Sequence, residues 1–458
     1  AILRGMAKLL LERNDTDSSV LDHEFIAQHC SHFDDYKQAI EATSWQQIIS
    51  QSGLTQSEIT QMTDIYMHSD KVIFTWAMGI TQHQHSVAMI QELINVLLLR
   101  GNIGKPGAGA CPVRGHSNVQ GNRTVGINEH PPQSLLDAIE ARYQFKPPQD
   151  SGLGTVDAIR AMRDKQAKVF IGLGGNFAAA TPDTTQTYNA LANCELTVNI
   201  STKLNRSHVV TGKQALILPC LGRTEVDLQA SGPQHITVED SMSMVHRSAG
   251  QNPPASDKLK SEVAIIAGMA ESVLGNDIVN WSNLKDDYAL IRDEIEAVIP
   301  NFTDYNDNIK LDRGFYLQNS AAQRVWNTGN NKANFSAASL PEQLVHELAA
   351  KDETSQTLTL QTLRSHDQYN TSIYGMDDRY RGIYNERRVL MMNRQDIKRL
   401  GFAANDVVTI STVSKDDITR SVSDFKIVEY DIPSGCLAAY YPETNPLVPL
   451  DSVAKDCG

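Results

Sequence analysis

Closely spaced cysteines are absent from this sequence, and its histidines form no metal-binding pair. The six cysteines stand at positions 30, 111, 194, 220, 436 and 457. A structural zinc site or an iron–sulfur cluster needs closely spaced thiolates, so this spacing argues against both within the chain. The thirteen histidines are scattered, and neither His83 with His85 nor His346 with His366 has a zinc-binding spacing. We expect mostly reduced, buried thiols and no metal ligand among these residues.

Long apolar runs and an excess of basic charge are also lacking. No run of about 18 apolar residues is present, and the N-terminus has no secretion-signal pattern. We therefore predict a cytoplasmic protein without direct membrane insertion, although export as the folded partner of another chain stays open. The 41 basic and 54 acidic residues give a formal charge of −13. This balance argues against nucleic-acid binding, because phosphate contacts need basic surface.

What the sequence does contain is the alternation of an α/β protein. Its 458 residues, 41% hydrophobic and 21% charged, have an ordinary globular composition, with room for about three units. The patterns predict buried strands at 71–76, 168–173 and 195–200, and helices at 1–13, at 85–100 and from Thr181 onward. Parallel strands with crossover helices place ligands at the carboxyl ends of the strands.

The pattern changes after residue 250. A linker at 251–257 precedes two expected helices, 262–274 and 284–299, and a polar loop at 327–339. Short apolar runs then alternate with turn residues, which indicates a small β-barrel. Its expected strands are 389–392, 407–410, 425–428 and 437–441, with one helix at 394–400 capped by Asn393.

Three polar clusters stand on this scaffold. Residues 101–128 hold seven glycines and two prolines, a composition that excludes a packed helix or strand and lets backbone N–H groups approach a ligand. The segment 201–208 offers donors from Lys203, Asn205 and Arg206, and the segment 363–382 is rich in amides, arginines and tyrosines. Each cluster taken alone is also consistent with a polar surface loop. Together, at strand ends, they favour one large phosphate-bearing cofactor.

Several motifs resemble the bis-molybdopterin guanine dinucleotide oxidoreductases. They are WAMGITQ at 76–82, GNIGKPGAG at 101–109, VRGHSNVQG at 113–121 and the tyrosine-rich cluster. The resemblance covers nearly the whole chain and is strongest to formate-dehydrogenase-like alpha subunits, in a branch linked to acid resistance. It implies a bis-molybdopterin guanine dinucleotide carrying Mo or W, and two-electron chemistry on formate or another small oxyanion. An electron-transfer partner protein would accept the electrons.

The resemblance also implies a fold and a domain order. We expect an α/β fold of parallel-sheet dinucleotide-binding domains with a helical insert, followed by a C-terminal double-psi-type β-barrel. The expected domains are 1–115, 116–250, 251–355 and 356–458. Enzymes of this kind carry a 4Fe-4S cluster and the protein ligand to the metal nearer their N-terminus. We therefore expect this chain to be roughly the C-terminal two-thirds of such an enzyme, inactive by itself.

Site residues follow from the same resemblance, position by position. Arg114 is the expected catalytic residue, because a guanidinium can hold a small oxyanion in two parallel hydrogen bonds. His116 stands where formate dehydrogenases of this kind carry Gln, and is either a proton relay or a pterin hydrogen-bond donor. The expected cofactor-binding residues are Met78, Gly79, Gln82, Gly115, Asn118, Gln120, Gly174, Asn176, Asn199, Ser201, Lys203, Asn205, Arg364, Gln368, Tyr369, Asn370, Glu443 and Asn445.

Two other functions fit parts of the sequence. A structural subunit of a redox complex can keep this fold without the cofactor, but the retained polar loops favour the enzyme, since an unpaired buried donor costs ~1–3 kcal/mol. A flavin or nicotinamide dehydrogenase would need a GxGxxG motif directly after a strand. The sequence at 173–176, LGGN, lacks that spacing.

Overall fold

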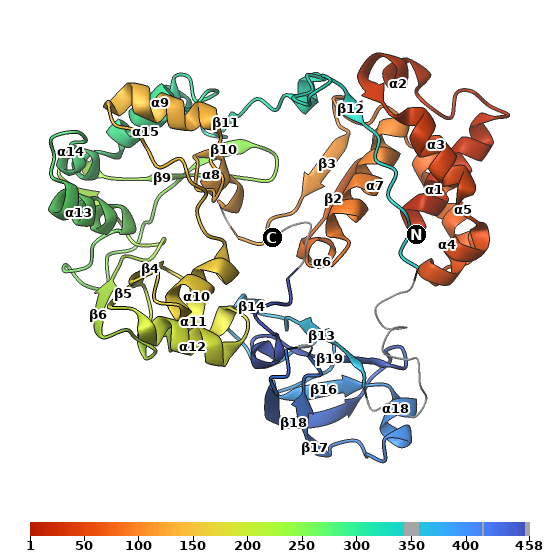
Figure 1. Cartoon of the computed structure of the whole chain (residues 1–458). Helices are drawn as coiled ribbons and strands as arrows, with labels where there is room; N and C mark the ends of the chain where they lie inside the picture. Colours follow the sequence, from red (N-terminus) through yellow and green to blue (C-terminus); the bar gives the residue numbers. More distant parts are fainter. Residues whose placement is uncertain (117, 343–356, 415, 454–458) are drawn as a thin grey trace.

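The computed structural model describes residues 1–116, 118–342, 357–414 and 416–453. Three lobes are visible: an N-terminal lobe (1–112), a middle lobe (119–325) and a C-terminal lobe (the described residues from 357 to 453) (Figure 1). Parallel strand pairs and covering helices confirm the expected α/β class. The expected domain boundaries stay predictions, and His346, Cys457 and the boundary at 355 lie outside the described residues.

The N-terminal lobe is a helical bundle beside a small parallel sheet. Its elements are α1 (Ile2–Asn14), α2 (His23–His29), β1 (Cys30–Ser31), α3 (Phe33–Ala42), α4 (Trp45–Ser52), α5 (Gln56–His68), β2 (Ile73–Trp76), α6 (Met78–Thr81), α7 (Ser86–Leu99) and β3 (Gly109–Pro112). Local signals set several ends: Gly53 ends α4 in the left-handed conformation, and Thr55 with Glu58 forms a capping box at α5.

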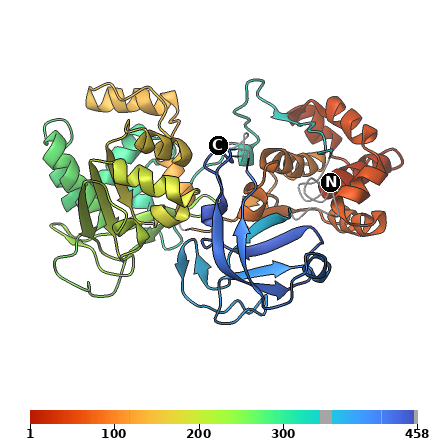
Figure 2. The ribbon, with the colours of Figure 1, turned by 60° about the horizontal axis from the view of Figure 1, so that its bottom comes forward.

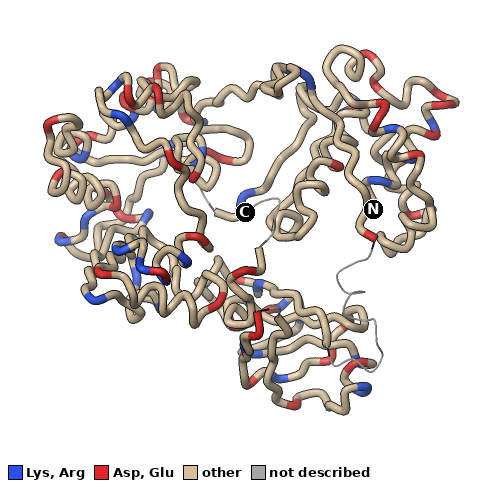
Figure 3. The backbone as a smooth tube through the Cα atoms, viewed as in Figure 1, with Lys and Arg blue, Asp and Glu red and all other residues tan. Residues whose placement is uncertain are grey.

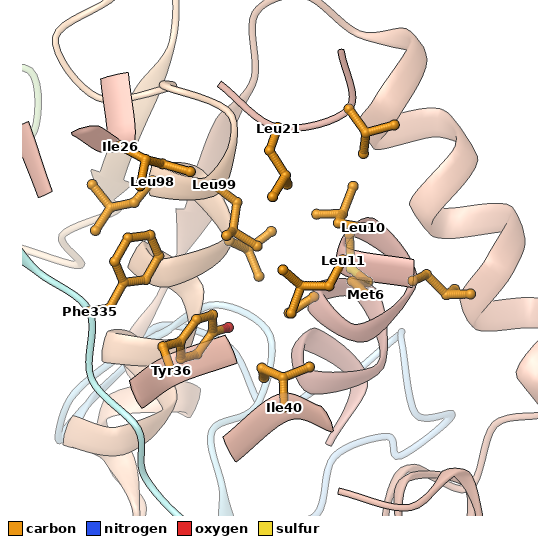
Figure 4. Close-up of a cluster of buried hydrophobic side chains, with 14 of the residues drawn as sticks. Met6, Leu10, Leu11, Leu21, Ile26, Tyr36, Ile40, Leu98, Leu99 and Phe335 are labelled. Carbon is orange, nitrogen blue, oxygen red and sulfur yellow. The ribbon is translucent and has the colours of Figure 1, made fainter. Parts of the chain in front are cut away.

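One apolar core holds this lobe together (Figure 4). Leu10 and Leu11 of α1 meet Leu98 and Leu99 of α7 in that core. A distant segment completes it, because β12 (Ala333–Asn334) pairs in parallel with β1 and brings Phe335 against the cluster. The expected loop at 327–339 therefore contains a short strand.

The expectation that residues 101–128 exclude a strand or a helix was wrong. Residues Gly109–Pro112 form β3, which pairs in parallel with β2, and α8 (Val119–Thr124) follows. The backbone hydrogen-bond partners of β3 lie 36 residues earlier in the chain, so local composition does not reveal them.

The middle lobe contains a three-stranded parallel sheet with helices on both faces. The elements from α9 to β6 are α9 (Gln133–Tyr143), α10 (Thr155–Arg163), β4 (Val169–Leu173), α11 (Phe177–Ala180), α12 (Thr184–Asn193), β5 (Leu196–Ser201), η1 (Arg206–His208) and β6 (Gln214–Pro219). Ile159 of α10 and Leu191 of α12 pack in the core on one side, while Ile265 packs against Val198 of β5 on the other. Of the three strands in this sheet, β5 is the one that is buried along most of its length. In the edge strand β4, Val169, Ile171 and Leu173 are about half-exposed, contrary to the expected buried strand.

The rest of the middle lobe adds a small antiparallel sheet and several helices. These elements are β7 (Leu228–Gln229), β8 (Gly232–Pro233), β9 (Ile236–Glu239), β10 (Met244–Ser248), α13 (Glu262–Leu274), α14 (Trp281–Asp286), α15 (Tyr288–Val298), α16 (Tyr305–Asn308), β11 (Phe315–Tyr316) and η2 (Ala321–Gln323). The helix expected at 284–299 is two helices, because Asp287 leaves the helical conformation and its side chain caps α15 at Ala289 N. The strand β11 pairs with β10.

The C-terminal lobe is a mixed five-stranded sheet around its own core (Figure 2). Its elements are β13 (Thr359–Leu363), β14 (Gln368–Tyr369), β15 (Ser372–Ile373), β16 (Val389–Met392), α18 (Arg394–Arg399), β17 (Val407–Ser411), β18 (Ser421–Glu429), β19 (Cys436–Tyr440) and η3 (Asn445–Leu447). The order β13-β19-β16-β18-β17 contains all four expected strands, and Asn393 caps α18 as expected. Closure into a barrel stays a prediction. Among the described helices, none is long and apolar enough to cross a bilayer.

Candidate functional site

Two loops lie side by side where β2 and β3 end. Parallel pairing aligns Trp76 with Pro112, so the turn into α6 and the loop that follows β3 leave the same edge of the sheet. A Cβ placed on Gly115 would have only the Met78 sulfur near it, at 3.9 Å. The structure therefore brings Met78 and Gly115 together, with Gly79 in the same turn.

Arg114 and His116 are exposed on this loop. The Arg114 backbone N–H donates to Ser241 Oγ at 3.2 Å, which fixes the loop against the β9–β10 turn. Among the described residues, no hydrogen bond or ion pair engages its guanidinium. The His116 ring lies edge-on to Tyr369 of β14, with ring centroids 6.3 Å apart. Residues from the N-terminal loop and the C-terminal lobe thus meet here.

The segment after His116 is held by β9. Asn118 Oδ1 accepts from Glu239 N at 3.0 Å, and Gln120 Nε2 donates to Glu239 Oε1 at 2.8 Å. Gly121 makes this possible, because a Cβ there would lie 1.9 Å from Asn118 Oδ1. Both amides are therefore engaged in holding the loop.

A second polar group forms where β4 and β5 end. Gly174 and Gly175 have φ of 67° and 69°, a region that L side chains rarely adopt, so glycine is required at this turn. Asn205 Nδ2 donates to Gly175 O at 2.7 Å, which ties the two strand ends together. Ser201 Oγ donates to Lys203 O at 2.8 Å. Lys203 is exposed, and its ammonium group has no partner among the described residues.

The other two residues of this group lie beside the same turn. Asn199 is buried, and its Oδ1 would be 3.2 Å from a Cβ on Gly172. Asn176 Oδ1 accepts from Ser207 Oγ at 3.4 Å. Asn199 and Asn176 therefore line the ends of neighbouring strands.

Arg387 organises the polar cluster of the C-terminal lobe, although it is not among the residues predicted from the sequence. Its buried guanidinium donates to Ser365 Oγ at 2.7 Å and to Tyr441 O at 2.9 Å, and it pairs with Glu443 at 2.6 Å. Gln368 accepts from the same guanidinium and donates to Tyr441 O. The only local signal was a basic pair before an apolar strand. Gln368 and Glu443 therefore stabilise this cluster.

The C-terminal cluster also contacts the middle lobe. Asn445 Nδ2 donates to Ala179 O at 2.8 Å and to Thr181 O at 2.9 Å. The Tyr441 hydroxyl lies 2.8 Å from Asn370 Oδ1 and 3.2 Å from Ala180 O. The structure thus places Asn370 and Asn445 beside the segment that follows Asn176.

The expected site residues fall into two groups, according to whether their side chains have a hydrogen-bond or ion-pair partner within the protein. The side chains of Asn118, Gln120, Asn176, Ser201, Asn205, Gln368, Asn370, Glu443 and Asn445 are engaged within the protein. The polar groups that no described residue engages by hydrogen bond or ion pair belong to Gln82, Arg114, His116, Asn199, Lys203, Arg364 and Tyr369. Arg364 stacks over the Tyr441 ring at 4.4 Å. No cluster of three acidic, histidine or cysteine side chains suited to a metal occurs among the described residues.

Part of the chain matches a known protein family. Residues 12–211 match the molybdopterin oxidoreductase family. The matched range contains the loops of Arg114 and His116 and the polar ends of β4 and β5.

Similar proteins match the chain beyond this range as well. An uncharacterized oxidoreductase of Mycobacterium tuberculosis is 47% identical over 99% of this chain and 58% of its own length. Protein YdeP of Escherichia coli K12 is 44% identical over 99% of this chain and 60% of its own length. Formate dehydrogenase H of Escherichia coli K12 is 32% identical over 28% of this chain and 17% of its own length. The chain thus spans about three-fifths of the first two relatives.

A solved structure supports the fold. Acetylene hydratase from Pelobacter acetylenicus superposes with a TM-score of 0.63 over 96% of this chain and 62% of its own, at 15% identity.

Two observations fit a molybdopterin cofactor. The required glycines at 174 and 175 allow backbone N–H groups to approach a phosphate, and several cationic or polar groups have no partner among the described residues.

Proposed function

We propose that this chain is the cofactor-binding part of a formate-dehydrogenase-like molybdenum oxidoreductase acting on formate or another small oxyanion. The observation that carries the proposal is the unengaged Arg114 guanidinium on a loop that Ser241 fixes from behind. His116 and Tyr369 lie beside the same loop. When bound, a molybdenum or tungsten ion held by two dithiolenes supplies two-electron oxidation or reduction.

Arg114 acts by orientation and charge. A planar guanidinium forms two parallel hydrogen bonds to a carboxylate, which fixes the substrate and balances its negative charge. The His116 imidazole can hold a proton at Nδ1 or Nε2 beside that position. The Ser241 hydroxyl holds the loop through the backbone N–H of Arg114. The guanidinium is therefore not needed to hold the loop and remains available for a substrate.

The cofactor we propose is a bis-molybdopterin guanine dinucleotide, held by residues of all three lobes. Gln82 and Lys203 are free to donate to its polar groups, and the 174–175 turn offers backbone N–H groups for a diphosphate. Arg364 and Tyr369 would contact it from the C-terminal lobe. Asn118, Gln120, Asn205, Glu443 and Asn445 support these residues from behind, since their side chains already have partners.

The wider setting of the reaction belongs to the same proposal. The electrons pass through a 4Fe-4S cluster to a partner protein, and the protein works in the cytoplasm, in a role related to acid resistance. The high identity to an oxidoreductase of Mycobacterium tuberculosis supports redox chemistry. The short match to formate dehydrogenase H supports formate as the first substrate to test.

Replacement of Arg114 by Lys in the full-length protein tests the proposed role. Lysine keeps the charge but cannot form two parallel hydrogen bonds, so we expect bound molybdenum to stay and kcat/KM for formate to fall. The loss of one charge-assisted bond, ~1.5–3 kcal/mol, corresponds to about 10- to 100-fold. The control is Arg223→Lys, on an exposed loop after β6, which should change neither quantity. Equal kinetics in both variants would remove Arg114 from the mechanism.

Metal and guanine-nucleotide analysis of the same protein separates the enzyme from a cofactor-free structural subunit. We expect about one molybdenum or tungsten and two guanine nucleotides per chain, as two dinucleotides require. Absence of both from the purified full-length protein would favour the structural subunit.

A further inference from the structure

An apolar groove runs along one side of the middle lobe, away from the loops described above. Its cavity has a volume of about 610 Å³ and lies among α9, α13, α14 and α15. The helix α15 packs against both α9 and α14. Leu135 and Ile139 of α9, Ile291 and Ile295 of α15, and Leu284 of α14 line the groove.

Two large apolar side chains that line the groove are exposed to solvent. Leu274, at the end of α13, is 69% exposed and Ile278 is 63% exposed, and both line the groove. Contiguous exposed apolar surface on a globular protein commonly marks a binding site, because its burial is favourable by roughly 25 cal/mol per Å². These side chains therefore favour an occupant.

The shape and periodicity of the groove fit a helix. Leu135, Ile139 and Tyr143 follow one another at intervals of four residues along α9, and Ile291, Ile295 and Ile299 do the same on the α15 side. Eight residues of helix rise about 12 Å, so each row is about two turns long. An amphipathic helix that presents apolar residues at i, i+4 and i+7 would lie along these rows.

Acidic and basic residues both occur along the segments that form the groove (Figure 3). The segments 133–146 and 262–300 together carry ten acidic and four basic residues. Glu294 lies in the groove lining, pairs with Arg142 at 2.7 Å and accepts from the Tyr143 hydroxyl at 2.8 Å. Its hydrogen bond with Arg142 lowers the pKa of Glu294, so the carboxylate stays ionised. The net negative charge of these two segments therefore favours a cationic partner.

We propose that this groove binds an amphipathic helix of a partner protein, with an apolar stripe and a lysine- or arginine-rich polar face. The apolar stripe buries Leu274 and Ile278, and the basic face meets the negatively charged segments that form the groove. The proposal is independent of the proposed redox function, because the groove lies in α9 and α13–α15 and uses none of the loops around Arg114.

Peptide binding to the full-length protein tests the proposal. The probe is an 18-residue helix with Leu at i, i+4 and i+7 and Lys on its polar face. The comparison peptides carry Glu on that face, or the Lys composition in scrambled order. Trp281 lines the groove, so its fluorescence reports binding. We expect micromolar binding of the Lys helix that weakens with salt, and at least about tenfold weaker binding of both comparison peptides.

Two matched variants locate the binding. Ile278→Asp places a charge in the groove at an exposed position and should weaken binding at least about tenfold. Val413→Asp, at a position 81% exposed on the C-terminal lobe, should leave binding unchanged. The proposal is overturned if the Lys helix does not bind, if the scrambled or Glu peptide binds equally well, or if Ile278→Asp binds as well as Val413→Asp. It is also overturned if the protein dimerises through this groove, or if its own chain already shields Trp281 from a soluble quencher.

Discussion

At the scale of single residues, His235 shows how surroundings set a charge state. Burial lowers its pKa to about 4, and the nearby Arg292 and Arg247 act in the same direction. Its Nε2 is buried without a partner among the described residues. The unfolded chain takes up this proton near pH 6.5, whereas the folded chain does so only near pH 4. Folding stability from this group is therefore complete above about pH 6.5 and is lost as the pH falls towards 4.

Replacement of His235 by Gln should remove that part of the pH dependence, because Gln does not titrate. We expect the melting temperature of the wild-type protein to fall more steeply between pH 6.5 and 4 than that of the variant. The control is His23→Gln, at an exposed position of α2, which should keep the wild-type slope. Parallel melting curves for the wild-type and His235→Gln proteins would contradict this assignment.

Residue types at the candidate site could be predicted from the sequence, but their partners could not. The glycines at 174 and 175 follow a strand, and their positive φ confirms why glycine stands there. In contrast, Asn118 meets Glu239 and Asn445 meets Ala179, more than 100 residues away in each case. Whether an amide is free for a ligand depends on such pairs, and no local pattern reports them.

At the scale of elements, a buried ion pair joins α1 to α7. Arg4 Nε lies 2.9 Å from Glu92 Oε1, and their side chains are 4% and 11% exposed. The Tyr36 hydroxyl and Asn95 also donate to Glu92, so the carboxylate is fully surrounded. Loss of one partner from such a pair is costly because the other charge stays buried.

Replacement of Arg4 by Met should therefore destabilise the N-terminal lobe by roughly 3–5 kcal/mol. Hydrogen exchange of α1 and α7 amides measures this locally, which avoids assuming two-state unfolding of a multi-lobe chain. The double variant Arg4→Met with Glu92→Leu should recover most of the loss. Arg13→Met removes a more exposed pair with Asp64 and should change protection by less than about 1 kcal/mol. Similar losses in Arg4→Met and Arg13→Met would contradict the argument.

Helices with strong local signals could be predicted almost to the residue, and elements that depend on distant pairing could not. The helix α13 has the expected bounds, because Ser261 caps its start and Gly275 follows its end. The strand β3 was missed since its hydrogen bonds go to β2. The break at Asp287 was missed because the apolar period continues through it, while a side-chain cap starts a new helix.

At the scale of the whole molecule, a polar junction fixes the C-terminal lobe on the middle lobe. Arg420 pairs with Asp183 at 2.7 Å, with side chains 5% and 4% exposed, and Leu450 N donates to the same carboxylate at 3.3 Å. Asn445 adds two hydrogen bonds to the segment before Asp183. The sequence does not reveal this junction, because its members stand more than 200 residues apart.

One carboxylate, that of Asp183, accepts from both Arg420 and Leu450 in this junction. Asp183→Asn keeps a residue that tolerates its φ of 49° and removes only the charge, so the fold of each lobe should remain. The buried Arg420 then loses one of its two acidic partners. We therefore expect faster hydrogen exchange at both α12 and β18, and we expect the two lobes to unfold in two separate thermal transitions. Asp157→Asn removes a more exposed pair with Arg160 and should change neither. Because the proposed cofactor spans both lobes, Asp183→Asn should also lower bound molybdenum in the full-length protein. Unchanged exchange at α12 and β18 would show that the lobes are held together elsewhere.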